Sequence, residues 1–511
     1  MDQITLPCSH RRTRLSILSL VVIISLMSPS APMKPFGIFD HHQDVGGPKI
    51  AGNSTYDLTN QTYTLSGAGL GTALDQFHFA WKKLQGDFIV QATVRFSGAS
   101  SNPRRQLGII ARDAFGNTSR YAAACVHGGP LTALQHRGAN GEAAQVELSS
   151  FHPTDIQLAR TGNQLTFSSA VFGESYKSVS HDVALADELE VGLFVSSQEE
   201  GVLAQAVFSN VRVIIPAAPN FKPYSDYLGS HLEVMEVATG QRKILHSEPG
   251  SIQAPNWTRD DHLLYNSAAG VMYSYDIASG TVAELNTGKC RQNNNDHVLS
   301  FDGKMLALSN YAGEPRRSVA FILPTKGSDE PKQITSPEAG HAFLHGWSPD
   351  GKKLVFTGGR KGETGNFRNL WSVDVDTKVE TALTPPGTLD DGPEYTPDGK
   401  YIYFNSVRTG TMQIWRMGPD GSNPEQVTFD EYNDWFPHIS PDGKWVLYIA
   451  FPIDMDPWSH PFYRQCYLRL MPTSGGVPKT VAYLYGGQGS INTPSWSPDS
   501  KRIAFVSNSK L

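Results

Sequence analysis

Apolar and polar residues alternate with a period of two through much of the first half of the chain. In the segment GDFIVQATVRF, the residues Phe88, Val90, Ala92, Val94 and Phe96 lie on one face. This alternation is typical of a half-buried β-strand. Similar runs recur, with Gly-rich turns between them, at residues 106–112, 121–127, 131–137, 156–160, 164–172, 190–196 and 204–215. Seven or more strands without a convincing helix predict an antiparallel β-sandwich over residues 44–215.

A repeat around a Pro-Asp-Gly turn fills the second half of the chain. Pro sets φ for such a turn, and Gly supplies a conformation that a side chain would resist. Apolar strands such as KLVFT at 353–357 and YIYFN at 401–405 follow the turns. The turn aspartates are Asp260, Asp302, Asp350, Asp398, Asp442 and Asp499, at steps of 42, 48, 48, 44 and 57 residues. A repeat of this length predicts a β-propeller with one four-stranded blade per repeat.

The two ends of the repeat region complement each other. The sixth repeat ends at Leu511 after only two strands, and a predicted hairpin at 230–245 supplies the missing ones. A ring closed by strands from both ends has no exposed edge. We therefore predict an all-β chain with a six-bladed propeller over 224–511, and seven blades is the alternative. The Pro-rich segment 216–223 predicts a linker between the two domains.

The first residues have the pattern of an export signal. Basic residues at 10–14 precede an uncharged apolar run at 15–27, and small residues follow up to Ala31. The run is short for a membrane-spanning helix, so we predict a signal peptide over 1–31 that is cleaved near Ala31. A retained signal anchor is the competing interpretation. Cleavage would leave a periplasmic or secreted protein without a stable membrane span.

Charge and motif content exclude several classes of protein. Lys+Arg 43 against Asp+Glu 49 gives a net charge of -6, so no global cationic surface is available and we expect no nucleic-acid partner. Cleavage would leave three scattered cysteines, which favours buried thiols over a disulfide scaffold. The chain has no CxxC pair, G-x-S-x-G elbow, Walker loop, dinucleotide fingerprint or HExxH motif.

Polar residues precede most of the turn aspartates. The innermost strand of each blade lines the channel of a propeller, so these residues are expected to converge on one funnel. Imidazoles and carboxylates on one axis can be ligands for Mn, Zn or Ca, or they can act in general acid/base catalysis on a sugar. Alternatively, they only satisfy neighbouring backbone groups. The predicted channel residues are Asn256, Asn295, Asp296, His297, His345, Asp391, Glu394, Asp434, Trp435, His438 and Asn492. An insertion at 452–464 is predicted to be a ligand lid or a packing arm against the sandwich.

The phrases GDFIVQATVRF, LGIIARD, LTALQHR and VGLFVSSQEEGVLAQAVFSNVRV resemble, in that order, the concanavalin-like (laminin-G-like, jelly-roll) sandwiches of exported bacterial carbohydrate-active proteins. The resemblance implies glycan binding on one sheet, where aromatics stack on sugars and amides or Arg bind hydroxyls. The alternation is equally compatible with ordinary strand residues at the candidate positions that bind no sugar. The candidates are Trp81, Arg112, Tyr121, His127, Gln135 and Arg137.

The repeat WSPDG, together with NSVRTGTMQIWRMGPDGSNPEQVT, resembles the TolB-type (PD40, WD40-like) propeller, whose family member TolB is the periplasmic component of the Tol envelope system. The resemblance implies the fold of residues 224–511 but says little about function, because propellers carry many functions. A predicted sandwich replaces the small α/β domain of TolB, so the Tol role does not transfer directly. Some metal-dependent oligogalacturonate lyases with propeller folds use a comparable channel.

Two functional hypotheses follow from these patterns. In the first, an exported TolB-like protein binds a polysaccharide or an envelope protein without turning it over. In the alternative, the protein is a carbohydrate-active enzyme, a polysaccharide lyase or glycoside hydrolase, whose channel residues act through a divalent metal.

Overall fold

The chain folds almost entirely into β-strands in a computed structural model. The predicted signal peptide at 1–31 lies outside the described residues. Within the described part, the one helical element is the 3-10 helix η1 (Thr72–Leu74). The structure describes residues 36–116, 118–139, 141–149, 152–360 and 368–511.

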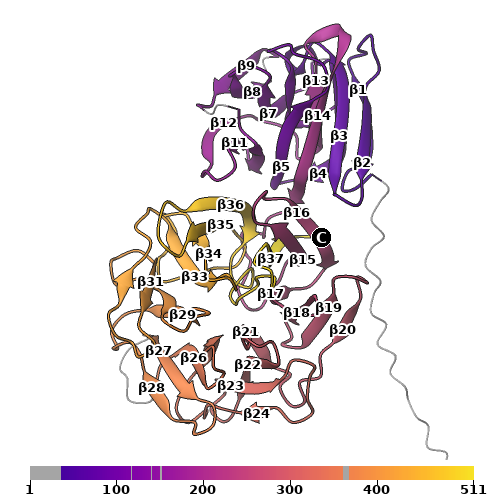
Figure 1. The fold of residues 1–511 in the computed structure, drawn as a ribbon. Coiled ribbons are helices and arrows are strands. Elements are labelled where there is room, and N and C mark those ends of the chain that lie inside the picture. Colours follow the sequence, from indigo (N-terminus) through magenta and orange to yellow (C-terminus); the bar gives the residue numbers. More distant parts are fainter. Residues whose placement is uncertain (1–35, 117, 140, 150–151, 361–367) are drawn as a thin grey trace, which may run out of the picture. The chain divides into compact units, whose positions relative to one another are not determined.

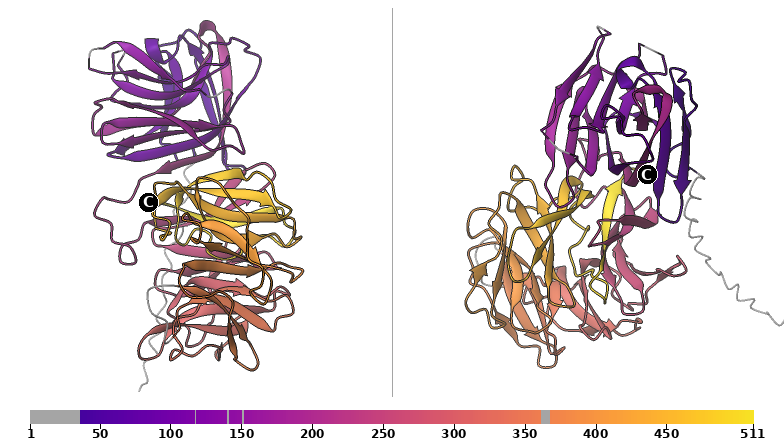
Figure 2. Two further views of the ribbon diagram at one scale, coloured as in Figure 1. Left: turned by 90° about the vertical axis from the view of Figure 1, so that its left-hand side faces the viewer. Right: turned by 45° about the horizontal axis from the view of Figure 1, so that its top comes forward.

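The N-terminal half forms two antiparallel sheets of seven strands each, and Figure 2 shows them facing one another. The first sheet has the order β1 (His41–Val45), β4 (Phe77–Gln85), β13 (Glu188–Ser196), β6 (Gln106–Arg112), β7 (Tyr121–His127), β8 (Thr132–Arg137) and β9 (Ala143–Glu147). The second has the order β12 (Lys177–Asp182), β11 (Gln164–Ala170), β10 (Asp155–Thr161), β5 (Phe88–Ser97), β14 (Glu199–Ile214), β3 (Thr62–Gly69) and β2 (Asn53–Asp57).

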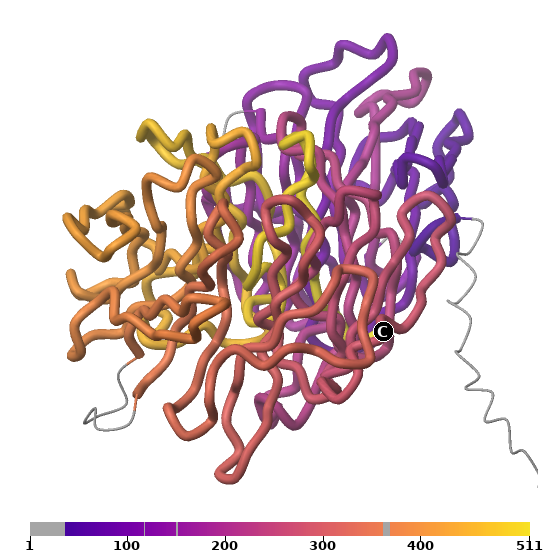
Figure 3. Tube along the Cα trace, turned by 60° about the horizontal axis from the view of Figure 1, so that its bottom comes forward, coloured from indigo at the N-terminus to yellow at the C-terminus, as the bar shows by residue number. Residues whose placement is uncertain are grey.

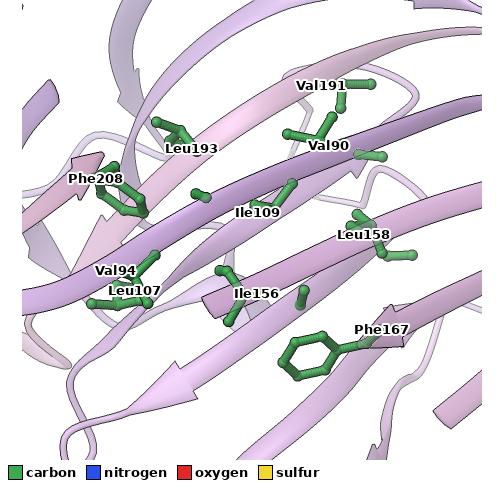
Figure 4. Packing of buried hydrophobic residues seen from close by; sticks show 14 of the residues in the cluster. Val90, Val94, Leu107, Ile109, Ile156, Leu158, Phe167, Val191, Leu193 and Phe208 are labelled. Atoms are coloured by element: carbon green, nitrogen blue, oxygen red, sulfur yellow. The ribbon is translucent and has the colours of Figure 1, made fainter. Parts of the chain in front are cut away.

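Alternate residues of the two sheets meet in one apolar core. Val90 of β5 and Leu158 of β10 come from the second sheet, and Ile109 of β6 comes from the first. Figure 4 shows these side chains packed together. The predicted apolar face of β5 therefore lies in the core. The prediction that this strand is only half-buried is wrong for its first half, because Ile89 on the other face packs with Tyr485.

The C-terminal half forms a ring of small antiparallel sheets (Figure 1), and each inner strand begins its blade. Five blades have four strands each, and the first two are β17 (Ile252–Trp257), β18 (His262–Ser267), β19 (Met272–Asp276) and β20 (Val282–Glu284), followed by β21 (Asn293–Leu299), β22 (Met305–Ala312), β23 (Arg317–Pro324) and β24 (Lys332–Gln333). The third and fourth are β25 (Phe343–Trp347), β26 (Lys353–Gly358), β27 (Asn369–Asp374) and β28 (Glu380–Ala382), followed by β29 (Asp390–Tyr395), β30 (Ile402–Ser406), β31 (Gln413–Met417) and β32 (Glu425–Gln426). The fifth blade consists of β33 (Asn433–Ile439), β34 (Trp445–Phe451), β35 (Arg464–Pro472) and β36 (Lys479–Gly486).

Strands from both ends of the propeller build the sixth blade. The last strand, β37 (Arg502–Ser509), pairs antiparallel with β15 (Gly229–Glu236), which pairs in turn with β16 (Arg242–Glu248). A single bridge from Trp496 to Ile503 adds the inner position of this blade. In Figure 3 the tube passes around the ring from rose through orange to yellow. The prediction of six blades closed by both ends is confirmed.

The repeated turns share one hydrogen-bond pattern. A Ser or Thr hydroxyl two residues before each turn aspartate donates to its carboxylate, as Ser348 Oγ does to Asp350 at 2.6 Å. The same hydroxyl accepts the N–H of Lys353, where the next strand begins, at 2.8 Å. These hydrogen bonds lower the pKa of the turn aspartates, and that of Asp398 falls to about 2. The six donors are Thr258, Ser300, Ser348, Thr396, Ser440 and Ser497.

This pattern predicts that the propeller loses stability in acid. The carboxyl pKa is lower in the folded than in the unfolded chain, where it is about 3.9. The stabilisation is therefore complete above about pH 4 and declines as the pH falls toward 2. Ser348→Ala should lower the free energy of unfolding by about 1 kcal/mol at pH 7 and by less at pH 2.5. Urea unfolding at both pH values measures this, with the exposed Ser474→Ala as control. An equal loss at both pH values would contradict the role of Asp350.

Candidate functional site

The inner strands bring most of the predicted channel residues onto one axis. Contacts between blades connect them: Asn256 of the first blade donates to Thr493 of the last at 3.0 Å, and His297 of the second blade lies 2.6 Å from Asn256. All are buried, each with less than a tenth of its surface exposed. The residues that contact a neighbouring blade in this way are Asn256, His297, His345, Asp391, Glu394 and His438.

The deeper histidines of the channel are committed to structural contacts. His438 Nδ1 lies 2.8 Å from the Glu394 carboxylate, and its Nε2 lies 2.7 Å from the carbonyl oxygen of Ile491 in the last blade. Both ring nitrogens therefore already have protein partners at hydrogen-bond distance. Burial lowers the pKa of His297 to about 3, so its ring is neutral at pH 7. These histidines link neighbouring blades.

A second cluster lies where the inner strands begin, and we call His345, Asp391, Asp296, Arg368 and His460 the channel entrance. His345 Nε2 lies 3.3 Å from the Asp391 carboxylate, and Arg368 Nη1 lies 3.8 Å from its other oxygen. Burial opposes ionisation of Asp391, but the hydrogen bond and charge of His345 outweigh it and lower the pKa. Burial raises the pKa of Asp296 to about 6, although His345 opposes this shift.

The entrance contains buried polar atoms that lack a hydrogen-bond partner in the described structure. Two of them are Asn295 Nδ2 and His460 Nδ1. Burial lowers the pKa of His460 to about 4, so this imidazole is neutral at pH 7. Asn492 donates to Gln488, and Gln488 donates to Asn295 Oδ1 at 3.4 Å, which connects the last blade to the second. A buried polar atom without a partner is costly, so these atoms are suited to receive a polar ligand group.

Two predicted channel residues face elsewhere. Asp434 lies among Arg469, Tyr448 and Thr428, and neither of its carboxylate oxygens has a hydrogen-bond partner within the described residues. Burial raises its pKa well above the usual range. Trp435 packs against the ring of His460, with 4.6 Å between ring centroids. Asp434 therefore lies near the buried Arg469 and Tyr448, and Trp435 packs beside the entrance.

Sequence patterns alone did not place Arg368 at the entrance. It lies directly before β27, and its backbone carbonyl accepts the N–H of Asp390 at 3.0 Å, which holds it beside the start of β29. Its side chain remains 46% exposed. No repeat register marks this position, because the residue belongs to a connection between the second and third strands of a blade. A basic residue beside an unusually long connection is the available signal.

The insertion at 452–464 has contacts with both of its predicted neighbours. His460 enters the channel entrance, where its ring packs 5.1 Å from that of Phe436. Phe462 and Tyr463 pack in one cluster with Ile89 of the second N-terminal sheet. The insertion is therefore a packing arm against the N-terminal sheets that also carries one side chain of the entrance.

The described residues contain no group of three or more His, Cys, Asp or Glu side chains arranged to hold a metal ion. The channel histidines have carboxylate, amide or backbone partners within hydrogen-bond or ion-pair distance. In the part of the chain that the structure describes, the cysteines are free and buried. No helix found there is long and apolar enough to cross a membrane.

The predicted glycan-binding residues of the N-terminal half share one face of the first sheet. They lie on β4, β6, β7 and β8, on the side opposite the core. The structure places all of them under other side chains or loops, and each has less than a tenth of its surface exposed. They are Trp81, Arg112, Tyr121, His127, Gln135 and Arg137.

Comparisons with known proteins match the second half of the chain. An uncharacterized protein of Agrobacterium fabrum is 38% identical over 278 residues, which are 92% of that protein and 54% of this chain. The model of the family described as TolB beta propeller domain matches residues 298–453. The chain belongs to the TolB β-propeller family.

Two other relatives of this TolB-family protein bear on its structure and function. A solved structure from Agrobacterium tumefaciens, described as a TolB candidate, is 37% identical, covers 56% of this chain and all of its own, and has a TM-score of 0.52. The Tol-Pal system protein TolB of Francisella tularensis is 28% identical over 288 residues. This match covers 54% of this chain and 61% of the Francisella protein.

Proposed function

We propose that this protein is an exported TolB-like propeller protein that binds an envelope protein or a polysaccharide without chemical turnover. The proposed organisation is a signal peptide over 1–31, a concanavalin-like sandwich over 44–215, a linker over 216–223 and the propeller over 224–511. β1 already begins at His41, so the sandwich starts slightly before residue 44. The mature protein would lie in the periplasm or outside the cell.

The observation that carries the proposal is the chemistry of the channel entrance. Asn295 Nδ2 and His460 Nδ1 are buried without partners, and the guanidinium of Arg368 stands half-exposed beside them. A partner segment that supplies an acceptor for Asn295 and a polar group for His460 would remove their desolvation cost. Tyr224 adds an exposed aromatic ring within electrostatic range of Arg368 and Asp296. Arg and Tyr are the residue types that contribute most to protein interfaces.

An envelope protein is the partner class that we favour for the entrance. One relative is itself a component of the Tol-Pal system. A half-exposed guanidinium beside the unsatisfied amide donor of Asn295 suits the carboxylates and backbone carbonyls of a peptide segment. The metal-dependent carbohydrate-active enzyme is the alternative, and no particular contact among the described residues favours it.

The N-terminal sheets are the proposed sugar-binding part. Their support is the convergence of Trp81, Tyr121 and Arg137 on one sheet face, where aromatic rings and hydrogen-bond donors lie together. Small-molecule sites usually combine an apolar surface with a few well-placed polar groups.

We expect Arg368→Ala to weaken binding of the soluble Pal domain from the same organism by about tenfold or more, because an interface arginine is removed. Titration calorimetry measures this. Arg259→Ala is the matched control, since Arg259 is an exposed arginine at the opposite, turn-bearing end of the inner strands. Equal affinities for all three proteins would contradict binding at the entrance. Turnover of a polysaccharide that depends on added Mn, Zn or Ca would favour the enzyme instead.

A further inference from the structure

Two arginines on the outer face of the first sheet converge on a single carboxylate. Arg112 of β6 and Arg137 of β8 flank Tyr121 of β7 in one row across the sheet. Arg112 Nη2 donates to Asp75 Oδ1 at 3.2 Å, and Arg137 Nη1 donates to Asp75 Oδ2 at 2.5 Å. All three charged side chains are at least 95% buried. The sheet therefore holds two buried guanidinium groups around one carboxylate position.

The carboxylate that fills this position comes from outside the sheet. Asp75 belongs to the short connection between β3 and β4, which we call the covering segment (residues 70–76). It has a left-handed backbone conformation, with φ of 54°. Besides the two ion pairs of Asp75, three hydrogen bonds hold the segment: Thr72 Oγ1 donates to Gln135 at 2.5 Å, the Thr72 N–H donates to Gln106 at 3.3 Å, and Arg137 Nη2 donates to the carbonyl oxygen of Ala73 at 2.6 Å. Leu74 at its outer side is 62% exposed. No residue of the segment belongs to a strand, so its displacement would leave the strand pairings of both sheets unchanged.

Two buried donors on this face of the first sheet remain unused. Arg112 Nη1 and Trp81 Nε1 are buried and have no hydrogen-bond partner among the described residues. The ring of Phe115 lies against both residues, 4.9 Å from the Trp81 ring and 5.8 Å from Arg112 Cζ. Two unpartnered donors at the same face as the arginines are costly in the closed state. They indicate a site that becomes fully hydrogen-bonded only with another occupant.

We propose that this face binds the carboxylate of an acidic sugar, a uronate, and that Asp75 occupies the carboxylate position in the unbound protein. The inference rests on the proposed glycan binding by the N-terminal sheets and adds the ligand class and the displacement of the covering segment. Two guanidinium groups recognise a carboxylate with high geometric specificity. The rings of Trp81 and Tyr121 offer apolar faces to a pyranose, and Gln135 offers an amide to its hydroxyls. This combination favours a sugar acid over an acidic peptide.

The test compares Asp75→Ala with the unaltered full-length protein. The probes are trigalacturonate and its fully methyl-esterified form, in which each carboxylate is replaced by a neutral methyl ester. Removing the internal competitor raises the fraction of sites that are open, so the variant should bind trigalacturonate about tenfold tighter or better. The ester should bind neither protein measurably. Calorimetry gives both affinities, and a thermal shift of Asp75→Ala with trigalacturonate gives an independent readout.

Further variants guard against misfolding. Asp75→Ala with Arg137→Met removes one guanidinium and should lose the gain in affinity. If Asp75→Ala fails to fold, Thr72→Ala loosens the covering segment while it keeps the ion pairs, and it should tighten binding in the same direction by a smaller factor. Equal binding of acid and ester would overturn carboxylate recognition while it leaves glycan binding standing. Absence of any binding by folded variants would overturn both. Equal competition by hexaglutamate would overturn the sugar as the ligand.

Discussion

Replacing Glu233 with alanine will lower the free energy of unfolding by about 3–5 kcal/mol, because the change leaves two buried arginines without their common partner. Glu233 of β15 is fully buried and accepts hydrogen bonds from Arg212 at 2.5 and 3.2 Å and from Arg242 at 2.8 and 3.0 Å. The hydroxyl of Ser507 on β37 donates to the same carboxylate. Burial opposes ionisation of Glu233, but the two arginines outweigh it and lower its pKa.

The position of this network explains the size of the effect. Arg212 belongs to β14 of the N-terminal sheets, whereas Glu233 and Arg242 belong to the closing blade of the propeller. Urea unfolding of the full-length chain measures the loss. Glu236→Ala is the matched control, because Glu236 lies on the same strand and is exposed. Glu233→Gln should fall between the two, since an amide keeps some hydrogen bonds and loses the charge. A loss below about 1 kcal/mol for Glu233→Ala would show that water replaces the carboxylate without cost.

Deleting residues 502–511 is expected to abolish cooperative folding of the propeller. The deletion removes β37, which pairs along its whole length with β15. The ring would then end in an unpaired apolar edge, which promotes aggregation. The buried side chains of Ile503, Ala504, Phe505 and Val506 would be lost with the strand. Loss of the sharp thermal transition and of soluble yield are the measured outcomes.

A point variant separates closure from simple truncation. Phe505 is fully buried in the core of the closing blade, and Arg242 Cζ lies 5.1 Å from its ring centroid. Phe505→Ala should cost about 3–5 kcal/mol through the cavity that it leaves. Lys510→Ala, which changes an exposed side chain beyond the strand, should have the stability of the unaltered protein. A truncated chain that still unfolds cooperatively at the same temperature would contradict the closing role of β37.

The fold was predictable from the chain to a large extent because its signals are local and repeated. The alternation in GDFIVQATVRF identifies the core face of β5. The turn around Asp350 and its equivalents identifies where the second strand of each blade begins. The prediction that β5 is only half-buried failed for its first half, because Ile89 packs in one cluster with Tyr485, nearly 400 positions away along the chain. A periodic pattern reports one strand and carries no information on what covers its second face.

The candidate sites were predictable in their residue types and not in their pairings. The channel registers placed His345 and Asp391 on one axis, yet only the packing of their adjacent blades brings the imidazole and the carboxylate to 3.3 Å. Asp434 occupies the register of Asp390, one residue before that of Asp391, so strand alternation turns its side chain to the other face of the blade, near Arg469. Arg368 has no pattern at all, because a connection is free of the repeat that constrains the strands.

The amino-acid order by itself determined strand periodicity, turn chemistry and the number of blades, since these depend on contacts between residues close along the chain. Only the tertiary structure decided which buried charges meet. Asp75 reaches two arginines across the first sheet, and Glu233 joins arginines from two halves of the chain. Such pairings depend on loop paths and ring closure, in which residues far apart along the chain are brought together by packing that no local pattern encodes.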